Sequence, residues 1–213
     1  MADIEKATKI LEILQERYED APQTYLNWEN PYQLLIVTIL SAHTTDAAVN
    51  SVSKDLFEKY PTPKDLANAD DEDIIDIIRS VGTYNRKTRY IKETAEMMVD
   101  EFDGEVPQNM EDLVRFTGVS RKTANVVLQT AFDINEGVVV DTHVGRVTKR
   151  LGLTEEKSAK KIEQDLMDLL PKDDWDEWAR IMGAHGRDLC NSRSPDCPNC
   201  PVNHLCPSAE LEQ

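Results

Sequence analysis

The chain has 213 residues and a formal net charge of −16, from 40 acidic and 24 basic side chains. This length allows one large domain or two small ones, and no run of eighteen apolar residues is present to span a membrane. The acidic excess opposes nucleic-acid binding, because phosphate contacts need positive charge. Because no apolar signal or transit peptide follows Met1, we expect a cytoplasmic protein.

Short amphipathic segments follow one another along the chain and predict an all-α fold. Apolar residues recur at helical spacing from Ile4 to Tyr18. Asn30 and Pro31 can start the next helix, and the nearly all-apolar segment from Tyr32 to Ala42 should be the central buried helix. Further helices are predicted over residues 46–59, 71–80, 84–102, 109–116, 121–133, 142–151, 155–170 and 174–185, with turns at 60–63 and 104–107.

Charge is distributed unevenly along the chain. The acidic residues gather at 70–73, 100–103 and 173–177, which is typical of solvated helix faces. The basic residues form one stretch with Arg79, Arg86, Lys87, Arg89 and Lys92, and another with Arg121, Lys122, Arg146, Lys149 and Arg150. These two basic stretches leave nucleic-acid binding open despite the net charge.

The segment from Leu113 to Ala124 contains a tight connection between two predicted helices. Gly118 can take a positive φ, and the first turn of the next helix offers unpaired N–H groups and the positive end of the helix dipole. Together they make a site for one backbone phosphate, which grips DNA without reading its sequence. Lys122 would lie beside this site, although a lysine on a helix is more often simply solvated.

A second constellation follows the apolar run at residues 138–140, which is too short to build a sheet. Asp141 comes directly before a predicted helix, so its ordinary role is that of an N-cap. Capping is compatible with chemistry, because the same N–H groups hold the carboxylate ionised and oriented.

The chain has four cysteines, Cys190, Cys197, Cys200 and Cys206, in the pattern C-x₆-C-x₂-C-x₅-C. Four thiolates in one short loop match the ligand set of a [4Fe–4S] cluster. A structural zinc site more often uses two separated CxxC pairs, and disulfides are rare in an intracellular chain. The spacing favours the cluster and leaves zinc and disulfides as alternatives.

Taken together, these motifs resemble the endonuclease III family of DNA glycosylases. The resemblance rests on the helix-hairpin-helix at 118–127, the aspartate segment at 140–144, the cysteine loop at 190–206, and two loops at 40–46 and 81–85. It covers about Leu34 to Cys206 with the elements in the family's order. In this chain His43 stands in place of a glutamine and Thr83 in place of a leucine, while Thr117 and Ser120 replace the hairpin's proline and second glycine.

The resemblance implies two helical lobes. One is a six-helix barrel over residues 24–135 that ends with the hairpin. The other is a four-helix lobe made from residues 1–23 and 136–213 and closed by a [4Fe–4S] loop. Lys122 and Asp141 would face each other between the lobes, where a flipped nucleotide could enter. The loop would present Arg193, preceded by Arg187, to the DNA backbone.

The implied activity is that of a bifunctional DNA glycosylase with DNA-(apurinic or apyrimidinic site) lyase activity. Lys122 would be the nucleophile that forms a Schiff base, and Asp141 would stabilise charge or accept a proton. His143 is expected to support the site from behind. The implied partner is double-stranded DNA with oxidised or ring-saturated pyrimidines or abasic sites, bound by a nucleoid-associated monomer. DNA contacts are expected at His43, Thr83, Gly118, Ser120 and Thr123.

Two alternatives remain at this stage. A monofunctional adenine or mismatch thymine glycosylase of the same superfamily would usually lack Lys122. A non-catalytic iron–sulfur DNA-binding module would have no use for a carboxylate such as Asp141 beside a phosphate site. The presence of both residues favours the bifunctional enzyme.

Overall fold

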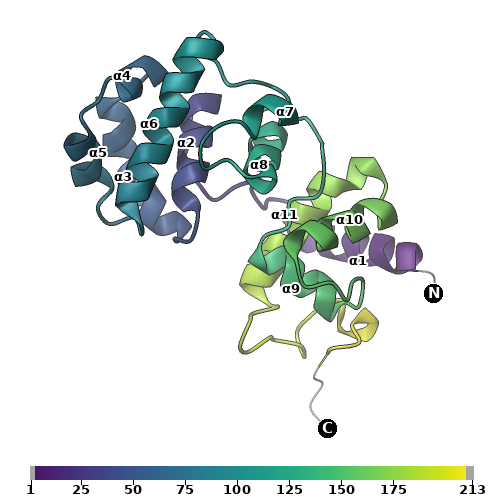
Figure 1. Cartoon of the computed structure of the whole chain (residues 1–213). Coiled ribbons are helices and arrows are strands. Elements are labelled where there is room, and N and C mark those ends of the chain that lie inside the picture. The colour runs from purple at the N-terminus through teal and green to yellow at the C-terminus, as the bar shows by residue number, and fades with distance from the viewer. Residues whose placement is uncertain (1–2, 210–213) are drawn as a thin grey trace. The chain divides into compact units, whose positions relative to one another are not determined.

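The computed structural model describes residues 3–209, and throughout that part the regular secondary structure is helical (Figure 1). The α-helices are α1 (Asp3–Arg17), α2 (Pro31–Ser41), α3 (Asp46–Lys59), α4 (Pro63–Ala67), α5 (Asp71–Ile78), α6 (Tyr84–Glu101), α7 (Met110–Leu113), α8 (Arg121–Phe132), α9 (Thr142–Arg150), α10 (Ala159–Leu169) and α11 (Trp175–Asp188). Two 3₁₀ turns, η1 (Lys172–Asp174) and η2 (Asn203–Leu205), complete the list. The predicted all-α class is confirmed. None of the helices in residues 3–209 is long and apolar enough to cross a membrane.

The chain divides into two compact units, each with its own apolar core. The first unit is continuous and comprises residues 24–136. The second combines the described residues of 1–23 with those of 137–213, so the N-terminal helix packs with the C-terminal third of the chain. We call them the hairpin unit and the cysteine unit.

The hairpin unit is organised around α2, which is buried along its length from Tyr32 to Leu40. Asn30 caps this helix by accepting a hydrogen bond from the Gln33 N–H at 3.0 Å, as the sequence predicts. Helices α3, α6 and α8 pack against α2, and α4 and α5 pack against α6. Phe116 closes this core beside the hairpin, with its ring edge-on to Phe102 at 5.4 Å.

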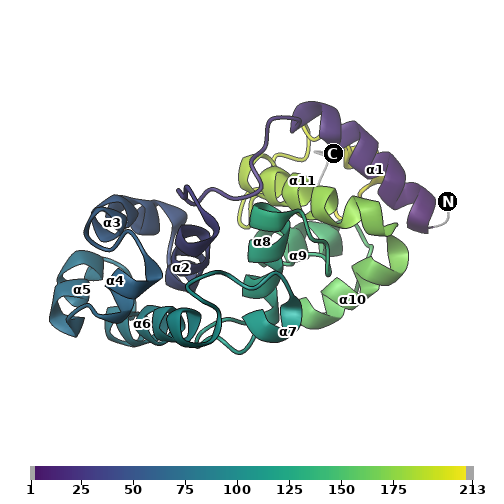
Figure 2. The ribbon, with the colours of Figure 1, turned by 90° about the horizontal axis from the view of Figure 1, so that it is seen from above.

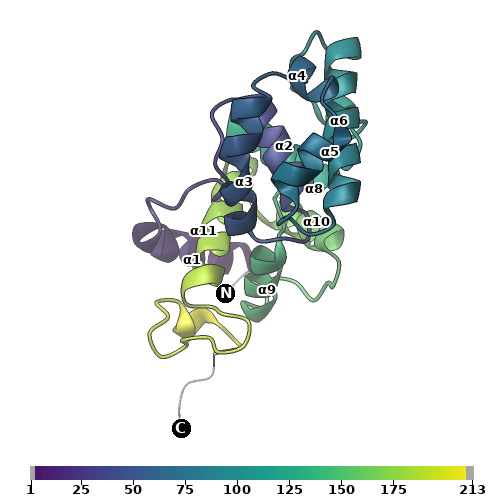
Figure 3. The ribbon, with the colours of Figure 1, turned by 90° about the vertical axis from the view of Figure 1, so that its left-hand side faces the viewer.

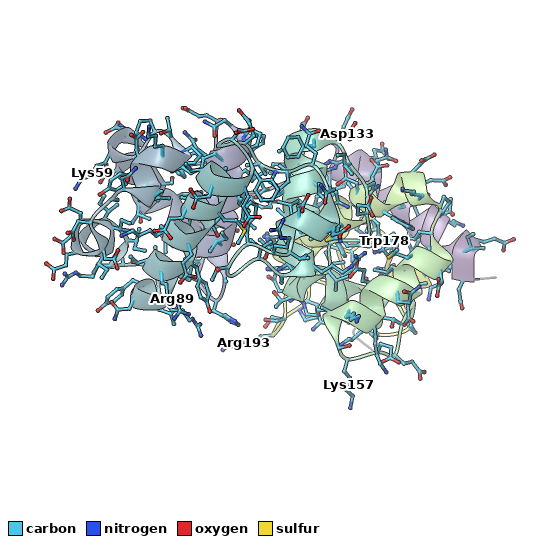
Figure 4. All side chains as sticks on the ribbon, turned by 45° about the horizontal axis from the view of Figure 1, so that its top comes forward. Lys59, Arg89, Asp133, Lys157, Trp178 and Arg193 are labelled. Carbon is cyan, nitrogen blue, oxygen red and sulfur yellow. The ribbon has the colours of Figure 1, made fainter. Side chains whose placement is uncertain are left out.

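The cysteine unit is built on α11, against which α1 and α9 pack (Figure 2). Trp178 of α11 is fully buried and lies inside this unit (Figure 4). Tyr18, directly after α1, donates a hydrogen bond to Asp188 at 2.9 Å, and its ring lies edge-on to His185. The cysteine segment follows α11 directly and lies beside α9 (Figure 3).

Three predicted elements differ from the observed ones, each for a local reason. The helix predicted over 155–170 begins at Ala159, where Ser158 caps it by accepting from Lys161 N–H. The helix predicted over 109–116 is a short segment that ends at Leu113. The turn predicted at 60–63 leads into α4. Thr62 and Asp65 form a reciprocal capping box at the start of this helix, and Pro63 is its first residue.

Candidate functional site

The connection before α8 is a tight hairpin that requires glycine for two reasons. Gly118 has φ +82°, which a residue with a side chain adopts only at a cost. A Cβ at this position would also stand 2.5 Å from Cδ2 of Tyr90. Gly118 therefore lies directly against the face of α6, and Thr94 of that helix donates a hydrogen bond to the Thr117 carbonyl at 3.2 Å.

The start of α8 is arranged to receive an anion. Ser120 caps the helix by accepting a hydrogen bond from the Thr123 N–H at 3.2 Å, and the two side-chain oxygens lie 3.1 Å apart. Ser120 has φ −87°, so the serine that replaces the family's second glycine fits this backbone without strain. Among residues 3–209 the N–H groups of Gly118, Ser120 and Lys122 form no hydrogen bond, and they remain available to a phosphate.

Lys122 lies at the second position of α8, in the first turn beyond the hairpin. Its side chain is exposed, and within the described part of the chain its ammonium group forms no ion pair or hydrogen bond. An exposed and uncommitted amine next to an anion site is the arrangement that a nucleophile acting on DNA needs.

Asp141 caps α9, and its carboxylate is held at both oxygens. Oδ1 accepts from the N–H groups of His143 at 2.8 Å and Val144 at 2.7 Å. Oδ2 lies 3.4 Å from Nη2 of Arg187, and the Asp141 side chain is 23% exposed. These donors fix the orientation of the carboxylate, while one side stays open to solvent. Arg187 is 46 residues away in sequence, and no sequence pattern indicated this contact.

His143 supports Asp141 from the adjacent position. Its Cβ lies 2.9 Å from the position that a Cβ on Gly186 would occupy. Its Nδ1 lies 3.3 Å from Nη2 of Arg146, and the same Nη2 donates a hydrogen bond to the Gly186 carbonyl at 2.7 Å. Burial, followed by repulsion from Arg187, lowers the pKa of His143 below its usual value. The ring is therefore neutral at pH 7 and packed behind the N-terminus of α9.

Lys122 and Asp141 belong to different units. Lys122 begins α8 of the hairpin unit, whereas Asp141 caps α9 of the cysteine unit. The expectation that they face each other stays a prediction.

The two loops predicted to face DNA share an unusual backbone feature. His43 and Thr83 both take positive φ, at 57° and 58°, which is rare for residues other than glycine, and for a β-branched residue is an outlier. The loops are neighbours, since a Cβ on Gly82 would stand 3.8 Å from the His43 carbonyl oxygen. Both side chains are exposed. Strain of this kind costs about 1–3 kcal/mol per residue and clusters at functional sites. Neither residue type indicated it in advance.

The four cysteines are free thiols whose residues line one pocket. The pocket is also lined by Val147 and Arg150 of α9, by His185 of α11 and by Leu189, which follows α11. Burial raises the pKa values of Cys200 and Cys206.

Arg150 fastens the start of the cysteine loop to α9. Its guanidinium donates to the carbonyl oxygens of Asn191 at 2.7 Å and Ser192 at 3.0 Å, and Nη1 lies 3.3 Å from the Cys190 sulfur. A positive group at this sulfur would offset the negative charge of metal-bound thiolates. Four soft sulfur donors in a largely apolar pocket, with one cation beside them, fit an iron–sulfur cluster chemically.

Residues 36–172 match the model of the HhH-GPD superfamily base excision DNA repair proteins. The chain belongs to this superfamily. Within it the chain is a member of the endonuclease III family, as relatives of that name show. It is 47% identical over 206 residues to Endonuclease III of Synechocystis sp. (97% of this chain and 94% of the relative). It is 36% identical over 203 residues to that of Escherichia coli (93% and 94%).

Solved structures agree with this membership. A trapped Endonuclease III–DNA covalent intermediate superposes with a TM-score of 0.92 at 41% identity, covering 98% of both chains. A thermostable thymine-DNA glycosylase superposes with a TM-score of 0.86 at 22% identity, covering 98% of this chain and 99% of the other, and this second likeness concerns the fold alone. Membership of the HhH-GPD superfamily agrees with the predicted family, the predicted fold class and the predicted DNA-repair function.

Proposed function

We propose that Lys122 and Asp141 carry the chemistry by which this chain acts as a bifunctional DNA glycosylase and abasic-site lyase of base excision repair. The observation that carries the proposal is the exposed, uncommitted amine of Lys122 in the first turn of α8, next to unpaired N–H groups suited to a DNA phosphate. A duplex gripped by the hairpin would bring a sugar of the bound strand within reach of this amine.

The Lys122 amine, once it has lost its proton, attacks C1′ of a nucleotide rotated out of the stack. The N-glycosidic bond breaks, and the base leaves with the bonding electrons and takes up a proton. The opened sugar then forms a Schiff base with Lys122. Removal of a C2′ proton expels the 3′ phosphate by β-elimination, which nicks the strand, and water finally releases the lysine.

Asp141 has two roles in this sequence. Its ionised carboxylate stabilises the positive charge that develops on the sugar as the base departs, and it accepts the proton that the attacking amine must lose. The N–H groups of α9 and the Arg187 guanidinium hold the carboxylate in a fixed orientation before substrate arrives.

The substrates we propose are oxidised or ring-saturated pyrimidines, together with abasic sites, in double-stranded DNA. Gly118, Ser120 and Thr123 would bind the phosphate backbone. The strained loops would place His43 and Thr83 at the gap left by the flipped nucleotide. Because relatives have glutamine and leucine at these two positions, the side chains that fill the gap in the duplex would stack differently in this chain. A chromosomal substrate also places the enzyme at the nucleoid, and we propose that it acts as a monomer with the hairpin and cysteine units as its two lobes.

We propose that Cys190, Cys197, Cys200 and Cys206 hold a [4Fe–4S] cluster. When bound, the cluster supplies structural order to the loop and takes no part in bond breaking. Arg150 and the pocket wall position the loop, and Arg193, which extends from it (Figure 4), would reach a DNA phosphate.

Reductive trapping tests the function directly. The protein is incubated with duplexes that each carry one defined lesion, with borohydride present during turnover. A covalent protein–DNA product together with released base is the expected result. Base release without trapping would indicate a monofunctional glycosylase, and neither product with any lesion would indicate a binding module.

A further inference from the structure

Three side chains at the start of α6 form a charged aromatic cluster that the functional site leaves unexplained. The guanidinium carbon of Arg86 lies 5.9 Å from the ring centroid of Tyr90, and that of Arg89 lies 5.4 Å from it. Both distances are within the range of a cation–π interaction. Both arginines are exposed, and Arg89 extends away from the helix (Figure 4).

The other cations of this basic stretch are already committed. Arg79 pairs with Asp76 at 2.7 Å, and Lys92 pairs with Asp71 at 2.6 Å. Lys87 is only 2% exposed and points inward. The stretch that the sequence marks as basic is therefore mostly neutralised or buried in the fold.

Arg86 and Arg89 are the exceptions. Arg86 forms no ion pair within residues 3–209, and Arg89 has only Glu93 at 3.7 Å, between side chains that are 63% and 42% exposed. An exposed pair of this length contributes little and is screened by salt. In a chain of net charge −16, two exposed guanidinium groups beside one ring, of which only Arg89 has an acidic partner, make a distinct local concentration of positive charge.

The cluster lies against the hairpin. Tyr90 is the residue whose Cδ2 would stand 2.5 Å from a Cβ on Gly118, so its ring packs on the glycine whose N–H points to the expected phosphate. One turn further along α6, Thr94 bonds the Thr117 carbonyl. The Tyr90 ring therefore contacts both arginines and the glycine of the phosphate site, and all of them belong to the hairpin unit.

We propose that Arg86 and Arg89 bind further phosphates of the duplex held by the hairpin, and that Tyr90 is the positioning residue that holds both arginines and the Gly118 turn in register. This inference rests on the proposed function only for the identity of the partner as DNA. Guanidinium groups bind phosphate through paired N–H donors, and both of these side chains are exposed. The cluster extends the grip along the backbone and does not read sequence.

The test is the salt dependence of binding to an undamaged duplex. Replacing both arginines, Arg86→Gln with Arg89→Gln, should reduce the slope of log affinity against log salt by about two, since each phosphate contact contributes about 0.9. Affinity at low salt should fall about tenfold or more. The matched control is Arg115→Gln, which removes an arginine stacked on Phe102 at 5.6 Å whose charge is neutralised by Glu101 and Asp112, and its slope should stay at the wild-type value.

A second pair of variants tests Tyr90. Its hydroxyl forms no hydrogen bond within the described residues, so Tyr90→Phe should bind as wild type, whereas Tyr90→Leu should weaken binding and lower the salt slope through loss of the ring. An unchanged slope in the folded double arginine variant, judged by circular dichroism, would overturn the proposal. Borohydride trapping of an abasic duplex at low salt separates the two ideas, because its absence in the wild-type protein would refute the enzymatic function while the slope still tests the cluster.

Discussion

The hairpin before α8 and the cysteine loop after α11 are both short irregular segments, yet they are held in place by different forces. The hairpin is fastened by packing, with Phe116 2% and Val119 8% exposed and with Gly118 seated on Tyr90. The cysteine loop is fastened by hydrogen bonds from Arg150 to its first carbonyl groups, and its pocket is lined by four thiols.

This difference shows which of the two segments is held in place by the packing of the chain itself. The hairpin's interior is apolar, and its contacts with α6 come from the chain's own packing. The pocket of the loop is lined by four cysteines, so under the proposed function its order would depend on the group that they bind. The two residues proposed to be catalytic follow the same division. Lys122 extends from the packed segment, whereas Asp141 is held by polar contacts at the start of α9.

The largest effect should come from removing the Lys122 amine, which extends from the segment held by packing. Lys122→Gln should abolish borohydride trapping and lower base release by at least about 10³-fold, while retaining affinity for lesion DNA because the hairpin is unchanged. Single-turnover base release and gel-shift binding measure the two quantities. Lys64→Gln, an exposed lysine of the same unit, serves as the control. Undiminished trapping in Lys122→Gln would identify another amine as the nucleophile.

Asp141→Asn tests the carboxylate that is held by the polar contacts at the start of α9. Asparagine caps a helix about as well as aspartate, so stability should change little, while base release should slow by about 10²–10⁴-fold through loss of the charge and the proton acceptor. Nicking at a preformed abasic site should survive better, because there the lysine meets an open aldehyde. Asp70→Asn, at the cap of α5, is the control, and equal losses of base release and nicking in Asp141→Asn would argue against a role specific to base release.

Cys197→Ser tests whether the loop depends on a bound group. Purified wild-type protein should be brown and contain about four iron atoms per chain for a Cys₄ cluster. The variant should lose iron, and amide exchange should increase in residues 190–206 while the helices of the hairpin unit keep their protection. Zinc without iron in anaerobically purified protein would contradict the cluster.

The smallest effect should come from a single methyl group in the hairpin. Gly118→Ala meets both the positive φ and the Tyr90 ring, and should lower the free energy of unfolding by about 2–4 kcal/mol and weaken binding to damaged and undamaged duplex alike. Gly104→Ala is the matched control, because Gly104 has φ +80° but nothing within 4 Å of its added Cβ. Denaturant unfolding of both variants isolates the contact with Tyr90. Equal losses would show that backbone strain alone requires the glycine.

The sequence by itself predicted the parts of this protein that depend on local chemistry. Helical periodicity, the cap at Asn30 and the glycine of the hairpin are short-range patterns, and the structure places a helix or turn at each. The sequence placed one helix start at residue 155, whereas the structure places it at residue 159, and the sequence did not predict α4. Both differences arise because capping by Ser158 and Thr62 competes with periodicity over only a few residues.

Only the tertiary structure decided which charged groups are free to act. The contact of Arg187 with Asp141 joins residues 46 positions apart, and the neutralisation of Lys92 depends on Asp71, which packing brings near from a helix 21 residues earlier. The positive φ of His43 and Thr83 is likewise imposed by neighbouring loops against the preference of the residues themselves. Local patterns specify what a residue can do, but burial and long-range neighbours decide whether its charge remains available.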